Sequence, residues 1–166
     1  MTVPGLPVES DGAVVLPLPA LYSSVTRARH LVRDLLRAWD YPELVEDAEL
    51  GTSELVANAV RHAGTDLVLT VGAQGGSAGV VKIAVQDGEP ELLRQTVARE
   101  SGLPEQGRGL QIVSTIASEW GVTIVTGGKV VWFQLRAPGA GAGARSPAAA
   151  QVRPRHHRRH RVGSAG

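Results

Sequence analysis

Three side chains of acid, amide and imidazole type recur at helical spacing in this 166-residue chain. On a helical wheel of about 100° per residue, Glu54, Asn58 and His62 fall on one stripe beside an apolar arc. The amide oxygen of Asn58 suits Mg²⁺, which takes one or two protein ligands together with waters and phosphate oxygens. Glu54 could also accept a proton from an attacking hydroxyl or water. A solvated stripe on an amphipathic helix explains the same spacing, so both interpretations stay open here.

A glycine segment, Gly107-Arg108-Gly109, leads directly into another predicted helix. Glycines at this place let backbone N–H groups approach a phosphate, and a helix N-terminus favours an anion. The chain has no GxxxxGK[ST] motif and no GxGxxG after its first strand, which disfavours P-loop and Rossmann sites. A flexible loop before a helix is the alternative explanation.

A single acidic residue, Asp87, ends a predicted apolar strand and is followed by Gly88. A buried carboxylate at a strand end can accept a hydrogen bond from the exocyclic amine of adenine. A plain Asp-Gly turn is common, however, and explains the same two residues.

The elements that must position these residues follow from hydrophobic periodicity and from glycine and proline. The sequence predicts an edge strand over 13–18, a helix over 23–39 capped by Ser23 or Ser24, and a second helix over 43–62. A hairpin over 67–85 follows, then a helix from 107 with an apolar stripe that reaches Trp120, then a hairpin over 122–135. This order predicts an α+β fold, a two-layer α/β sandwich whose mixed, mostly antiparallel sheet has helices on one face.

Composition indicates one globular domain between two less ordered ends. We expect a flexible N-terminus over 1–12, a domain over 13–137 and a disordered basic tail over 138–166. Six Arg and three His lie beyond residue 136, whereas the first 136 residues hold 11 Lys and Arg against 16 Asp and Glu. Only the tail is therefore suited to nucleic acid. With no cysteine, signal peptide or long apolar run, the sequence predicts a cytoplasmic protein without a membrane partner.

The order of the motifs resembles one family. The segments ELVANAVRHAG (54–64), VQDGEP (85–90), GRGLQIV (107–113) and GKVVWFQL (128–135) are similar to the histidine-kinase-like ATPase domain of the GHKL superfamily, whose fold is of the Bergerat type. More narrowly, they resemble stand-alone anti-sigma-factor serine/threonine kinases. The resemblance spans about residues 20–136 and implies ATP and Mg²⁺ as cofactors, with residues 91–106 as the ATP lid.

The resemblance also assigns roles to individual residues. Glu54 matches the glutamate taken as general base, Asn58 the Mg²⁺-coordinating asparagine, and Asp87 the adenine-reading aspartate. The implied nucleotide-binding set is Asn58, His62, Asp87, Gly88, Gly107, Arg108, Gly109 and Leu110. The family's fuller first glycine box reads Asp-x-Gly-x-Gly, whereas here Asp87 is followed by Gly88, Glu89 and Pro90.

Two functions therefore stay open. In the first, the protein is a kinase that phosphorylates a STAS-domain anti-sigma-factor antagonist and sequesters a sigma factor; homodimerisation is compatible with the resemblance. In the second, which the Asp87–Pro90 departure motivates, it is a catalytically weak, nucleotide-gated binding module. A sensor kinase would need a helical hairpin with a phospho-acceptor histidine, and His30 lies on a single predicted helix.

Overall fold

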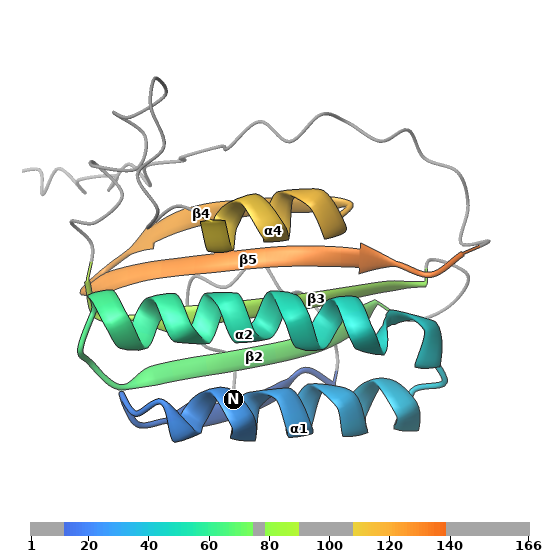
Figure 1. Ribbon diagram of the computed structural model, residues 1–166, viewed down its shortest axis with the longest axis horizontal. Helices are drawn as coiled ribbons and strands as arrows, with labels where there is room; N and C mark the ends of the chain where they lie inside the picture. The colour runs from blue at the N-terminus through green and yellow to red at the C-terminus, as the bar shows by residue number, and fades with distance from the viewer. Residues whose placement is uncertain (1–11, 75–78, 90–107, 139–166) are drawn as a thin grey trace, which may run out of the picture.

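The computed structural model describes residues 12–74, 79–89 and 108–138. Along the chain they form β1 (Val14–Leu18), α1 (Ser23–Ala38), the 3₁₀ turn η1 (Pro42–Leu44), α2 (Val45–His62), β2 (Leu67–Gln74), β3 (Val80–Asp87), α4 (Arg108–Ile116), β4 (Glu119–Val125) and β5 (Gly128–Arg136). Figure 1 shows α1, α2 and α4 side by side on one face of the sheet.

The five described strands form one sheet in the order β1-β2-β3-β5-β4. All four neighbouring pairs are antiparallel, including β3 with β5, which are not consecutive in the sequence. The predicted two-layer α/β sandwich is thus confirmed, with no parallel pair among these strands. The β3–β5 pairing brings the end of β3 next to the start of β5, at the turn of the second hairpin, and this juxtaposition shapes the candidate site.

The core lies between the sheet and its helices. Alternate residues of the strands point to the helices, so Leu69, Ile83 and Phe133 are fully buried there. The apolar arc predicted for α2 is confirmed, since Ala48, Leu55, Val56 and Ala59 are buried while Val45 and Val60 pack against the core. A Cβ at Gly51 would lie 2.6 Å from Cζ of Phe133, so a glycine allows α2 to approach the sheet closely.

Two local predictions were wrong. Helix α4 ends at Ile116, and Trp120 lies on β4, because the backbone N–H of Ser118 donates to the carbonyl of Gln134 and thereby joins the chain to β5. No serine side chain caps α1; the N-cap is Tyr22, and the Ser24 hydroxyl instead donates to the carbonyl of Pro19 at 2.7 Å. Competition from this local bond explains the difference.

Several predictions concern residues outside the described ranges: the flexible N-terminus predicted over 1–12, of which only residue 12 is described, the ATP lid over 91–106, and the basic tail over 138–166, of which only residue 138 is described. Among the helices that the structure describes, none is both long enough and apolar enough to span a membrane.

Candidate functional site

The stripe on α2 lies at the edge of the core, as predicted. Glu54, Asn58 and His62 are all partly exposed, whereas Leu55 and Ala59 on the adjoining face are buried. The side chain of Asn58 has one long contact, in which Nη1 of Arg61 donates to Oδ1 at 3.4 Å. These polar groups therefore stand beside the core without being sealed inside it.

The start of α4 lies directly against this stripe. A Cβ built on Gly109 would lie 2.8 Å from Oε2 of Glu54 and 2.8 Å from Nδ2 of Asn58. Such distances are too short for a side chain, so the absence of a Cβ lets the backbone of α4 approach both residues. The structure thus brings together the acid, the amide and the glycine that the sequence analysis singled out separately.

The donor set at this edge fits Mg²⁺ bound together with phosphate. In the described ranges, no three His, Cys, Asp or Glu side chains gather to hold a metal ion by themselves. The amide group of Asn58 and the carboxylate of Glu54, beside a helix N-terminus, instead suit a cation whose remaining ligands are waters and phosphate oxygens. Asn58 would hold the metal ion, which would offset charge on the phosphates when bound.

A second polar group, Asp87, lies where β3 ends. It is 3% exposed and its partner in the sheet register is Lys129 of β5, on the face that the helices cover. Oδ1 of Asp87 accepts hydrogen bonds from Nζ of Lys129 at 2.8 Å and from the backbone N–H of Glu89 at 3.0 Å. Lys129 also donates to the carbonyl of Glu89 at 2.8 Å. We call this buried ion pair the Asp87–Lys129 pair.

The turn after Asp87 is anchored to the loop that follows α2. The backbone N–H of Gly88 donates to Oγ1 of Thr65 at 2.9 Å, and a Cβ at Gly88 would lie 3.0 Å from that oxygen. A Cβ at Gly128 would collide with the carbonyl oxygen of Asp87. Close backbone approach therefore fixes the end of β3 against both β5 and the loop after α2.

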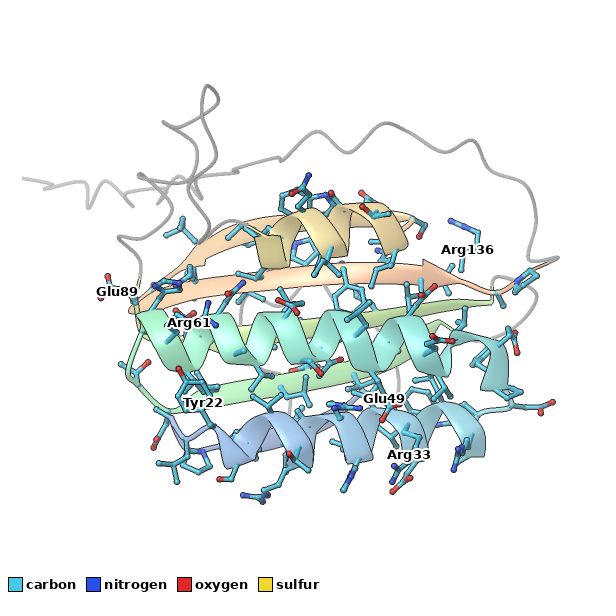
Figure 2. The ribbon with its side chains drawn as sticks, in the orientation of Figure 1. Tyr22, Arg33, Glu49, Arg61, Glu89 and Arg136 are labelled. Atoms are coloured by element: carbon cyan, nitrogen blue, oxygen red, sulfur yellow. The ribbon has the colours of Figure 1, made fainter. Side chains whose placement is uncertain are left out.

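His62, the last residue of α2, lies within electrostatic reach of Lys129. Burial lowers the pKa of His62, and the positive charges of Arg61 and then Lys129 lower it further. The imidazole is therefore held towards its neutral form, close enough to the Asp87–Lys129 pair to sense its lysine. Figure 2 shows Arg61 and Glu89 towards the same end of the molecule, the end at which α2 finishes.

Other predicted site residues lie elsewhere or outside the described ranges. Gly107 and the side chain of Arg108 are outside them, although Arg108 begins α4. Leu110 packs against the core, so only its backbone is suited to a ligand. His30 is exposed on α1, a helix that packs against α2.

Sequence reasoning missed Lys129 and Thr65. Lys129 is one of only two lysines in the chain and directly follows the Gly127-Gly128 turn, which was the available signal. Its contact with Asp87 depends on the pairing of β3 with β5, which local patterns do not reveal.

The chain matches the family model described as the histidine kinase-like ATPase domain over residues 18–135. This range includes every element from α1 to β4 and all but the last residue of β5. No curated protein matches the chain. The extent of the family match, and the meeting of Glu54, Asn58 and Gly109 within it, place the chain in the family of histidine kinase-like ATPase domains.

Proposed function

We propose that this protein binds Mg·ATP at the edge formed by Glu54, Asn58 and Gly109 and transfers the γ-phosphoryl group to a serine or threonine hydroxyl. The observation that carries the proposal is the fit of Gly109 against Glu54 and Asn58, at 2.8 Å from an ideal Cβ to each side chain. Membership of the histidine kinase-like ATPase domain family supports the ATP-binding part.

Each residue has a distinct task in this proposal. Backbone N–H groups at the start of α4 face the phosphates, where the positive end of the helix stabilises negative charge. Asn58 offers an amide oxygen to Mg²⁺. Glu54 accepts the proton of the attacking serine or threonine hydroxyl. The hydroxyl oxygen bonds to the γ-phosphorus while the bond from that phosphorus to the departing ADP breaks.

The acceptor that we propose is a STAS-domain anti-sigma-factor antagonist. This narrower assignment is supported by the order of the sequence motifs, which resembles that of anti-sigma-factor serine/threonine kinases. Phosphorylation of the antagonist would leave this protein free to hold a sigma factor.

The test is transfer of radiolabel from [γ-³²P]ATP to STAS-domain proteins encoded in the same genome. We expect a labelled serine or threonine with the wild-type protein. Glu54→Gln keeps the size of the side chain and removes the base, so it should lower transfer by about a hundredfold or more while ATP affinity changes little. Failure to label any STAS candidate, with ATP bound, would sink the kinase assignment.

A second function is favoured by the Asp87–Lys129 pair. Asp87, which the family resemblance assigns to adenine, already has an ion-pair partner at 2.8 Å. A module that binds nucleotide weakly, holds a protein partner and transfers no phosphate fits this feature. Nucleotide-dependent retention of a sigma factor by both the wild-type protein and Glu54→Gln, together with no transfer of label to any STAS-domain protein by the wild type, would identify that function.

A further inference from the structure

The carboxylate of Asp87 is not a free acceptor. Among the residues that the structure describes, Lys129 and the backbone N–H of Glu89 donate to this carboxylate, both to Oδ1, so Oδ2 is the oxygen available to a ligand. The side chains of Asp87 and Lys129 are 2% and 10% exposed. Water therefore screens the pair weakly, and any ligand group that approaches Oδ2 also experiences the ammonium charge.

Lys129 adds a donor beside this acceptor. An ammonium group carries three N–H bonds. Two of them donate to Oδ1 of Asp87 and to the carbonyl of Glu89, each at 2.8 Å. The third has no partner in the described part of the chain and is left for a ligand, so the pair presents one donor and one acceptor with no net charge.

This combination changes what the site can recognise. A bare carboxylate only accepts hydrogen bonds; it favours an amino group on a purine and repels a carbonyl oxygen in the same place. An ammonium next to the carboxylate weakens the preference for the amine, because the negative charge is already paired, and offsets the repulsion of the carbonyl.

We propose that Lys129 is a specificity-determining residue that makes the base subsite accept both 6-amino and 6-oxo purine nucleotides. The inference rests on the proposed function, because Asp87 must face the base of a bound nucleotide. The inference can be tested separately from phosphate binding, because Lys129 and Asp87 belong to the sheet whereas Gly109 belongs to α4.

The experiment compares dissociation constants for Mg·ATP, Mg·ITP and Mg·tripolyphosphate on the full chain. ITP replaces the 6-amino group with a carbonyl, which puts a hydrogen on N1, and is otherwise the same purine. The variant is Lys129→Met, which keeps the length of the side chain and removes its charge. The matched control is Lys82→Met, which changes the only other lysine, a buried residue on the opposite face of the sheet.

In the wild-type protein and in Lys82→Met we expect the ITP and ATP constants to agree within about threefold, and tripolyphosphate to bind at least about tenfold more weakly. In Lys129→Met, ATP should be preferred over ITP by about tenfold or more, because the carboxylate is then unpaired. The ratio of two ligands on one variant is insensitive to a uniform loss of folded protein.

Three results overturn the inference alone, and two of them are ratios: a wild-type preference for ATP over ITP of more than about threefold, or an unchanged ratio in folded Lys129→Met. Equal binding of tripolyphosphate and ATP also overturns it, because the base is then not read, while phosphate binding stands. Absence of binding by all three ligands overturns the proposed function and this inference with it. If Lys129→Met does not fold, the wild-type ratio decides.

Discussion

The backbone of Gly109 lies so close to Glu54 that a Cβ on the glycine would stand 2.8 Å from Oε2 of the carboxylate. Glu54 belongs to the middle of α2 and Gly109 to the first turn of α4. Their contact places the positive end of one helix beside the acid on another. A larger residue at position 109 would meet only the ends of the polar side chains of Glu54 and Asn58. Such a substitution should therefore disturb ligand binding more than the packing of the core.

Substitution of Gly109 by alanine should therefore impair nucleotide binding more than folding. We expect Gly109→Ala to weaken Mg·ATP affinity about tenfold or more, since Glu54 and Asn58 must move away from the positions that we propose for them at the phosphates. The free energy of unfolding should change by no more than about 1 kcal/mol, because alanine has the better helix propensity. Calorimetric titration and urea unfolding measure the two effects.

Gly51→Ala is the control for this prediction, since it changes another helical glycine. There the new Cβ would lie 2.6 Å from the ring of Phe133, so overpacking should cost about 1–3 kcal/mol of stability. Nucleotide affinity of the folded fraction should hardly change. The reverse pattern in the two variants would contradict the assignment of Gly109 to the site.

The Asp87–Lys129 pair should show strong thermodynamic coupling. Removal of one partner leaves a buried charge without compensation, so Lys129→Met and Asp87→Leu should each cost about 3–5 kcal/mol of unfolding free energy. The double variant should cost much less than both losses together. Urea unfolding of the four proteins provides the cycle. Additive losses would show that the two groups do not stabilise each other.

His62 should titrate below its usual range. Because its pKa is lowered in the folded protein, the unfolded chain takes up this proton first as the pH falls below 6.5. The contribution of His62 to stability is therefore constant above pH 6.5 and declines as the pH falls from there towards the folded pKa. In a pH series of thermal unfolding, His62→Gln should lose this part of the acid dependence.

NMR titration of the His62 imidazole tests separately the causes that lower its pKa. In Arg61→Gln the pKa of His62 should rise, yet stay below 6.5, because burial is the largest cause and remains. A folded-state pKa at or above 6.5 in the wild-type protein would contradict this prediction.

Lys82 and Trp132 form a cation–π contact on the face of the sheet opposite the helices. Nζ of Lys82 lies 3.9 Å from the ring centroid of Trp132, and Lys82 is 4% exposed. Trp132→Leu removes the aromatic face that stabilises this buried cation, which should cost about 2 kcal/mol or more. Mg·ATP affinity should stay unchanged, because Lys82 and Trp132 lie on the side of the sheet away from the helices. A variant with unchanged stability would show that the cation–π contact contributes nothing.

The fold could be predicted from sequence because its signals are local. The apolar arc of α2 and the alternation in β2 and β3 each depend on neighbours within a few residues, and each was confirmed. The extent of α4 was not predicted, because the spacing that puts Trp120 on a helical stripe also fits a strand. Pairing with β5 decided between the two.

The site could be predicted only in part, because some of its contacts join segments that are far apart in the sequence. Glu54 and Asn58 share one helix, so their common stripe follows from helical geometry alone. Their contact with Gly109 and the pairing of Asp87 with Lys129 join segments that are distant in sequence. No local pattern specifies such contacts, so Lys129 escaped prediction although Asp87 did not.

The central claim is that Glu54, Asn58 and Gly109 form a Mg·ATP site, and calorimetric titration of the wild-type protein and Asn58→Ala with ATP, with and without Mg²⁺, tests it most directly. We predict that the wild-type protein binds ATP at least about tenfold more tightly with Mg²⁺ than without, and that Asn58→Ala loses this dependence because the amide oxygen is gone. A wild-type protein that binds no ATP in the presence of Mg²⁺, or a folded Asn58→Ala variant with unchanged affinity and unchanged Mg²⁺ dependence, would contradict the claim.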